Sequence, residues 1–300
     1  MANRLIHQIN KNAVTIAEDM SGMPGLAAPI EEEGIGFDFR MSMGVPDYWI
    51  KLIEDKKDEE WHVGDLFYQM TNKRADEHTV SYAESHDQAM VGDKTILFRL
   101  LDKEIYSSMN VFQRNMVVDR GMALHKMIRL LTITTAGDGY LNFMGNEWGH
   151  PEWIDFPREG NGWSYEHARR LWHLVDDDNL RYRYLNAFDK AMLKLVKKEK
   201  IFRYRPEPMV RDNERQILIF SRGSLVLAFN FNPTRSFSDY RFGTQPGKYV
   251  DVLDTDDTLF DGFGRIDKKT AHFTLYDESD GNQMSIYLPA RSALVLKLQD

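Results

Sequence analysis

The order of strand-like and helix-like segments constrains the fold of this chain more than any other feature. Short apolar runs that resemble β-strands stand at residues 14–17, 36–40, 79–83 and 139–144, and the polar loops that follow them are enriched in Gly, Trp and acidic residues. Helical spacing of apolar residues follows at 46–53, 119–131, 165–174 and 180–197. Alternating strands and helices are typical of a parallel sheet or barrel. A closed (β/α)8 barrel has eight such units in ~250 residues, so residues 1–199 are predicted to form about half of one.

The pattern changes near residue 200. Short alternating runs follow, separated by turn residues, at 216–221, 225–231, 248–253, 272–276, 284–288 and 293–298. This spacing predicts an antiparallel β-sandwich over residues 200–300. The predicted fold class is therefore α/β, half of a barrel followed by an all-β sandwich domain. The charge run at 54–60 is interpreted as solvated surface, and Asp119 as a cap for the long helix after it.

Composition excludes several classes of function. The chain has no cysteine, which rules out disulfides, thiolate catalysis and Cys-based zinc sites. Its net charge of −8 leaves no basic footprint for nucleic acid or an anionic membrane, and favours a neutral ligand, small or polymeric. No run is long and apolar enough for a membrane span, and the first residues lack the apolar core of a signal peptide. We therefore expect a cytoplasmic protein without a cofactor.

Two carboxylates follow predicted strands directly. Glu18 comes after the first strand and Asp87 after the third. In a parallel barrel the C-terminal ends of the strands converge on the active site, and two carboxylates are the usual equipment for breaking a glycosidic bond. As a general acid, Glu18 would need an enclosed site that raises its proton affinity. Position alone leaves a surface role for Glu18 and a loop-capping role for Asp87 open. The next residue, Asp19, points to the opposite face of an extended strand and is interpreted as structural.

The residues beside Asp87 suggest other chemistry, which their spacing restricts. Ser85, His86 and Asp87 cannot form a nucleophilic triad, because adjacent residues do not reach the required relay geometry. His86 and Asp87 can instead hold sugar hydroxyls and stabilise positive charge that develops on a sugar ring. A structural pair remains the alternative.

A second loop carries residues with metal-binding spacing. Glu147 and His150 are three residues apart, but the flanking glycines argue against a helix there and no second histidine completes a motif, so no metal site is predicted. Trp148, Trp153 and Trp163 could stack on sugar faces, although core packing is the more common role for any one tryptophan.

Four longer motifs carry a resemblance to a known family. TIAEDMSGMP (15–24), YAESHDQAMVGDK (82–94) and YLNFMGNEWGHPEW (140–153) resemble the eukaryotic-type 1,4-α-glucan (glycogen or starch) branching enzymes. These belong to the α-amylase family, glycoside hydrolase family 13. The segment YLPARSALVL (287–296) is similar to the close of that family's C-terminal β-domain. The resemblance extends over essentially the whole chain.

The resemblance implies a role for each candidate residue. Glu18 would be the general acid/base at the end of the fifth barrel strand, Asp87 the transition-state stabiliser at the end of the seventh, and His86 a donor to sugar hydroxyls. Enzymes of this family cleave an α-1,4 bond, hold the chain as a covalent glycosyl-enzyme and transfer it to a 6-hydroxyl. The implied product is an α-1,6 branch in glycogen or starch.

One part of the family pattern has no match. The family's nucleophilic Asp ends the fourth strand within an Arg-Phe-Asp-Gly type motif, and Asp38 cannot take its place because it follows Glu18 in the sequence. We therefore expect the C-terminal half of a branching enzyme, inactive alone because no covalent intermediate can form. Its expected partners are an α-1,4-glucan and the N-terminal half of the barrel or a second copy. The alternatives are a related α-glucan hydrolase and a non-catalytic glucan-binding or barrel-complementing fragment.

Overall fold

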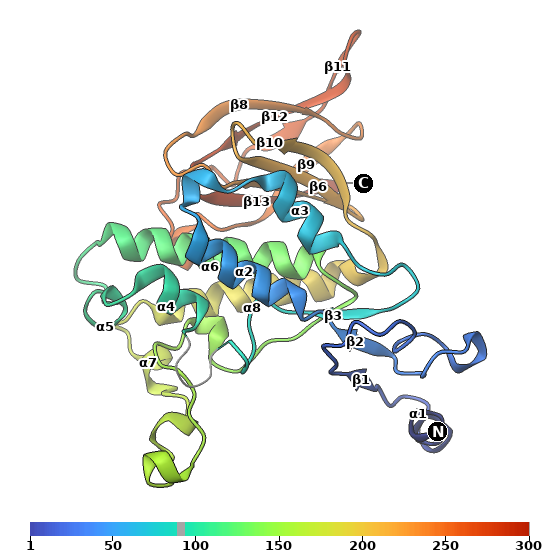
Figure 1. The fold of residues 1–300 in the computed structure, drawn as a ribbon. Helices are drawn as coiled ribbons and strands as arrows, with labels where there is room; N and C mark the ends of the chain where they lie inside the picture. The colour runs from blue at the N-terminus through green and yellow to red at the C-terminus, as the bar shows by residue number, and fades with distance from the viewer. Residues whose placement is uncertain (89–93, 300) are drawn as a thin grey trace.

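The computed structural model describes residues 1–88 and 94–299 (Figure 1). The helices and the parallel strands come first along the chain. They are α1 (Ala2–Ile9), β1 (Ile16–Ala17), β2 (Phe39–Met41), α2 (Gly44–Asp55), α3 (Val63–Thr71), β3 (Thr79–Ser81), α4 (Ile96–Leu101), α5 (Glu104–Ser107), α6 (Met116–Thr135), β4 (Gly139–Tyr140), α7 (His173–Asp176) and α8 (Tyr182–Glu199). The antiparallel strands follow as β5 (Glu207–Asp212), β6 (Ile217–Arg222), β7 (Leu225–Asn230), β8 (Phe237–Gly243), β9 (Lys248–Asp254), β10 (Ala271–Phe273), β11 (Leu275–Asp277), β12 (Gly281–Leu288) and β13 (Ser292–Gln299).

The first four strands form one parallel sheet in the order of the sequence, β1-β2-β3-β4. Ile16 pairs with Phe39, and Val80 pairs with Gly139 further along the sheet. Each strand is only two or three residues long, shorter than the apolar runs that predicted them. Sequential parallel order is the arrangement within a barrel. Its two outer strands, β1 and β4, have no further strand beside them among the described residues.

Helix α6 lies at the centre of the helical layer (Figure 1). Its side chains are buried nearly all round, including the polar His125, Lys126 and Thr132, so it lacks the one-sided apolar stripe of a surface helix. The helix also starts earlier than expected. Asn115, not Asp119, caps it, because the Asn115 side chain accepts hydrogen bonds from the backbone amides of residues 117 and 118.

Two sheets form the β-sandwich. A six-stranded sheet has the order β10-β9-β13-β7-β6-β5, and a three-stranded sheet has the order β11-β12-β8. Apolar side chains of both sheets form a core between them that includes Ile219, Tyr240, Met284 and Leu296. Strands β5 and β8 were not predicted from the sequence, because many of their side chains are exposed and charged or polar residues interrupt their apolar ones. The single strand predicted at 272–276 is instead two strands in different sheets, β10 and β11.

Two further expectations are corrected. No continuous helix spans 165–174; a 3-10 turn at Glu166–Ala168 and the short α7 stand there. The charge run at 54–60 is exposed as expected except for Asp58, which is 3% exposed. Asp58 accepts hydrogen bonds from Arg120 on α6 and from Arg291 between β12 and β13. A buried carboxylate needs such partners, and periodicity cannot show that they exist.

The helical layer and the sandwich share a continuous hydrophobic core. The ring of Phe67 on α3 lies 5.6 Å from that of Phe220 on β6, and Trp61 lies 5.9 Å from Phe231. Lys126 on α6 donates to two backbone carbonyl oxygens of the segment that follows β9. The two parts are therefore packed together along a broad contact.

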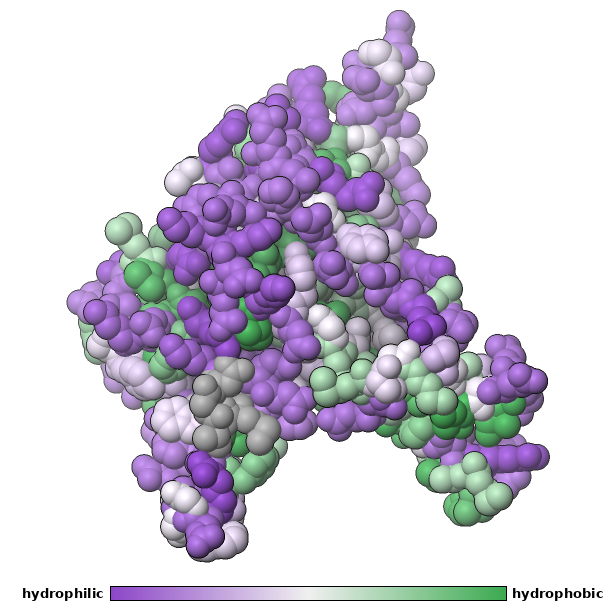
Figure 2. All heavy atoms as spheres, in the orientation of Figure 1, coloured by the Kyte–Doolittle hydropathy of each residue, from purple (hydrophilic) through white to green (hydrophobic). Residues whose placement is uncertain are grey.

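Apolar side chains also reach the surface. Figure 2 shows green spheres gathered on the N-terminal arm that carries α1 and β1. The exposed apolar residues of this arm include Ile9, Val14, Ile16, Met20 and Met23. Beside β4, Ile133, Tyr140, Leu193, Val196 and Phe202 line an apolar hollow of about 510 Å³. None of the described helices is long and apolar enough to cross a membrane.

Candidate active site

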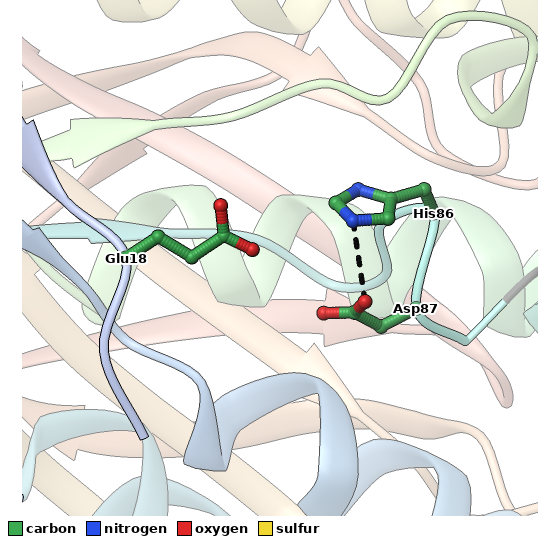
Figure 3. Close-up of side chains that lie close together, drawn as sticks. All are labelled: Glu18, His86 and Asp87. Atoms are coloured by element: carbon green, nitrogen blue, oxygen red, sulfur yellow. Dashed lines mark ion pairs between the residues drawn. The ribbon is translucent and has the colours of Figure 1, made fainter. Parts of the chain in front are cut away.

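The structure brings the three predicted site residues together from two strands. Glu18 follows β1 directly, and His86 and Asp87 lie in the turn after β3. Figure 3 shows the Glu18 carboxylate pointing towards the other two side chains. One ligand-type atom from each of the three lies within 4.8 Å of the others, and His86 Nε2 is 3.2 Å from Asp87 Oδ1. The end-of-strand positions therefore do converge, as the parallel sheet requires.

A buried segment of the chain leads to His86 and Asp87. Residues 82–85 are all buried, whereas the side chains of His86 and Asp87 are 42% and 39% exposed. The carboxylate of Glu84 accepts a hydrogen bond from the backbone amide of Ile96, at 2.7 Å, where α4 begins. Burial raises the pKa of Glu84 to about 7, against the opposing effects of this bond and nearby arginines. The polar pair thus stands at the tip of a fixed segment.

An open cavity of about 440 Å³ contains both candidate acids. It is lined by Glu18, Asp19, Met20, Met43, Asp47, Asp87 and Gln88. Asp19 lines this cavity too, although its side chain was expected to face away from Glu18. Hydrogen bonds from Ser21 lower the pKa of Asp19. Its engagement with the local turn agrees with a structural role.

Sequence reasoning missed Asp47 and Gln88 as members of the site. Asp47 lies in the first turn of α2, three residues after the helix begins and shortly after β2. The rule that carboxylates after parallel strands converge would have found it, because β2 lies between the strands that carry Glu18 and Asp87. No such signal marks Gln88, whose side chain is buried beneath the turn.

Tyr82 places an unsatisfied hydroxyl beside the acids. Its side chain is fully buried, and its hydroxyl has no hydrogen-bond partner among the described residues. Burial raises the pKa of Tyr82, and the negative charges of Asp87, Asp47 and Glu18 raise it further. A buried hydroxyl without a hydrogen-bond partner costs free energy. Within the described residues, nothing offsets this cost for Tyr82.

The other residues weighed from the sequence have structural partners. Asp38 accepts hydrogen bonds from the backbone amide and hydroxyl of Thr15, which joins β2 to the start of β1. Gly145 donates its amide hydrogen to Glu147 Oε2. His150 accepts a hydrogen bond from the amide of Leu171 at Nε2, and its Nδ1 lies 3.1 Å from the carbonyl oxygen of Glu152. These contacts leave neither ring nitrogen of His150 free.

The three loop tryptophans differ in burial, and only the core-packing role of Trp148 is confirmed. Trp148 is fully buried against Trp172 and Tyr182, as core packing predicts. Trp153 and Trp163 are 37% and 66% exposed. Both residues belong to the segment between β4 and α7, part of which projects from the body of the molecule (Figure 1).

The geometry permits two kinds of chemistry. A carboxyl group opposite a His–Asp pair can exchange a proton with a leaving oxygen while the pair holds sugar hydroxyls. The same three side chains could each give one ligand atom to a cation, although exposed acids often cluster without one. Glu18 is exposed, so the described residues do not supply the enclosure that a general acid requires.

Comparison with known proteins identifies relatives along the whole chain. The sequence model of the "Alpha amylase, C-terminal all-beta domain" matches residues 209–299. The 1,4-alpha-glucan-branching enzyme of Rhizophagus irregularis is 50% identical over 304 aligned positions, which cover 99% of this chain and 44% of the relative. The enzyme of the same name from Felis catus is 48% identical and covers 100% and 44%. The chain thus spans less than half the length of these relatives.

Solved structures show the same fold at much lower identity. A debranching enzyme from Nostoc punctiforme superposes with a TM-score of 0.60 at 16% identity, covering 97% of this chain and 53% of that one. A cyclomaltodextrin glucanotransferase superposes with a TM-score of 0.58 at 12% identity, covering 99% and 53%. The fold resemblance, the matched β-domain and about 50% identity to the named relatives agree. The 1,4-alpha-glucan-branching enzymes are therefore homologues of this chain along essentially its whole length.

Proposed function

We propose that this chain carries the acid/base half of a glucan-branching active site. Glu18 is the general acid/base, Asp87 the transition-state stabiliser, and His86 a contact to sugar hydroxyls. The convergence of these three side chains from β1 and the turn after β3 is the observation that carries the proposal. The relatives are named for the branching of a 1,4-alpha-glucan, and the family resemblance implies the reaction, cleavage of an α-1,4 bond and transfer of the chain to a 6-hydroxyl. Placement in the cytoplasm stays a prediction from the sequence.

The covalent intermediate requires a further carboxylate. In retaining chemistry a nucleophile lies ~5–5.5 Å from the acid/base. Glu18 first protonates the leaving oxygen, the nucleophile forms the glycosyl-enzyme, and Glu18 then removes the proton from the incoming 6-hydroxyl. Since Asp38 is engaged by Thr15, we propose that the nucleophile comes from outside this chain.

Among the described residues no strand pairs with β1 on the side away from β2, which leaves room there for a strand that carries the nucleophile. In the family, the nucleophile ends the strand that precedes the one carrying the acid/base. A strand paired with β1 on the side away from β2 would end beside Glu18. The apolar N-terminal arm and the hollow beside β4 lie next to the two open edges of the sheet. We therefore propose that residues 1–199 form the C-terminal half of a (β/α)8 barrel, with a sandwich domain from residue 200.

A chimaera tests this proposal. The N-terminal part of the Rhizophagus irregularis relative that this chain does not cover would be fused before Met1. We expect the chimaera to form α-1,6 linkages from amylose, detected by proton NMR of the anomeric region. Glu18→Gln should abolish transfer while leaving glucan binding nearly intact. Glu31→Gln, at an exposed site outside the cavity, serves as the matched control.

The outcomes separate the alternatives. Transfer by the Glu18→Gln chimaera at the level of the parent would remove Glu18 from the mechanism. New reducing ends without α-1,6 signal would indicate a hydrolase, and glucan binding without either product a non-catalytic fragment.

A further inference from the structure

We propose that Gln88 is the positioning residue of this site, and that its side-chain amide ties the turn carrying Asp87 to Asp47 on α2. The inference rests on the proposed function, and it concerns a residue that does not itself need to contact the sugar. Gln88 is 8% exposed and lies at the wall of the cavity that contains Glu18 and Asp87.

The carbonyl end of the Gln88 side chain closes the turn. Gln88 Oε1 accepts a hydrogen bond from the backbone amide of Ser85 at 2.9 Å and another from Ser85 Oγ at 3.1 Å. Ser85 Oγ in turn accepts from the amide of Asp87 at 3.3 Å. The backbone of Asp87 is therefore held through Ser85 by a side chain one residue further along.

The amide end of Gln88 reaches across to another element. Gln88 Nε2 donates to Asp47 Oδ1 at 3.2 Å, and Asp47 lies in the first turn of α2. The partners fix which way the amide faces, because an N–H of Ser85 needs an acceptor and a carboxylate accepts only from a donor. Of the uncharged side chains of this length, glutamine alone provides both an acceptor and a donor here.

This link determines where the Asp87 carboxylate lies. Helix α2 follows β2, and β2 lies between the strands that lead to Glu18 and Asp87. Fixing the turn to α2 therefore fixes the separation of the two acids across the cavity. Catalysis depends on such separations, since a displacement of about 1 Å can cost on the order of 100-fold in rate.

A charge-swapped pair tests the link. In Gln88→Glu, a carboxylate can still accept from Ser85, but it places an oxygen in place of the donor 3.2 Å from Asp47. Adding Asp47→Asn returns a donor on the opposite side of the same contact. Gln88→Met, which has similar length and no charge, keeps the test open if Gln88→Glu does not fold. Asp47→Asn alone measures the effect of the lost charge.

Two readouts are needed. The first is hydrogen exchange of the Ser85 amide in the 300-residue chain, which does not depend on activity. We expect the Ser85 amide to exchange faster in Gln88→Met than in the parent chain. In the double variant Asp47→Asn/Gln88→Glu, exchange should be closer to the parent rate than in Gln88→Glu alone. The second is transfer by the chimaera, where Gln88→Glu should lower kcat by roughly 10–100-fold with little change in KM. The double variant should recover most of that loss.

Each result decides the proposal. Unchanged Ser85 exchange in Gln88→Met would overturn the link, whatever the activity. Changed exchange with an unaffected kcat would show a bond that serves stability alone, and failure of the double variant to recover kcat would likewise refute positioning. If the chimaera with Gln88 intact forms no α-1,6 linkage, the proposed function fails and the positioning role fails with it.

Discussion

Asp58→Asn should destabilise the chain strongly, although the residue lies in a charge run that looks like solvated surface. Asp58 Oδ2 accepts from Arg120 Nε at 2.8 Å and from Arg291 Nη2 at 2.8 Å, while its other oxygen accepts from Arg120 Nη2. The carboxylate thereby joins α6 to the turn between β12 and β13. The substitution keeps the shape of the side chain and removes the charge that both arginines need.

The expected loss follows from the burial of the three groups. Removing one partner of a buried ion pair costs ~3–5 kcal/mol. The carboxylate side chain is 2% exposed, but the side chains of Arg120 and Arg291 are 31% and 25% exposed, so water can partly solvate them once the carboxylate is gone. We therefore expect the lower end of that range, about 3 kcal/mol.

The decline of the unfolding free energy at acidic pH should also depend on Asp58. Burial of Asp58 opposes ionisation, but hydrogen bonds and the charges of Arg120 and Arg291 outweigh it and lower the pKa of the carboxyl group. A lowered folded-state pKa stabilises the protein above the unfolded value of 3.8, and this contribution is lost as the pH falls through the folded value. In Asp58→Asn the unfolding free energy should therefore fall less steeply at acidic pH than in the parent chain.

The assay is urea unfolding followed by circular dichroism at pH 7, with the difference in free energy taken at a common slope. Asp55→Asn, an exposed acid of the same charge run, is the matched control and should change stability by less than about 0.5 kcal/mol. A loss in Asp58→Asn no larger than in the control would refute the ionic link as a stabilising contact.

Other predictions concern single side chains. Burial and Arg170 lower the pKa of His150 to about 4. The contribution of its neutral form to stability is therefore fully present above pH 6.5 and is lost as the pH falls towards 4. Urea unfolding of His150→Gln should show a shallower dependence of the unfolding free energy on pH over this range. Tyr82→Phe removes a buried hydroxyl that has no partner among the described residues. It should raise the unfolding free energy by about 1 kcal/mol in the same assay, whereas a loss would reveal a partner. Leu193→Lys, on a residue 38% exposed in the hollow beside β4, should reduce co-purification with a separately expressed N-terminal part without lowering the thermal midpoint.

Apolar pattern predicted the elements that bury one face and missed those that do not. The four parallel strands and most sandwich strands stand where runs of apolar residues indicated them. Strands β5 and β8 expose many of their side chains; β5 shows no regular alternation of burial, and in β8 only Tyr240 and Phe242 are buried, at alternate positions. The helix predicted at 165–174 was wrong. Spacing there suggested a helix, but its aromatic residues Tyr165 and Trp172 remain 65% and 45% exposed, so a helical face would bury little of them.

The sequence by itself determined which residues could act. Glu18 and Asp87 follow strands, and the order of a parallel sheet sends the ends of its strands to one edge, so their convergence is a consequence of local pattern and topology. The motifs around them also sufficed to indicate the family.

Only the tertiary structure decided which side chains support the site and how the helical layer packs against the β-sandwich. The contact of Gln88 with Asp47, and of Asp58 with Arg120 and Arg291, joins residues far apart in the sequence. Periodicity reports whether a side chain prefers water or a core, and says nothing about which polar groups meet once both are buried. Those partners are set by packing, because a buried polar group must find its hydrogen bonds wherever the fold has placed them.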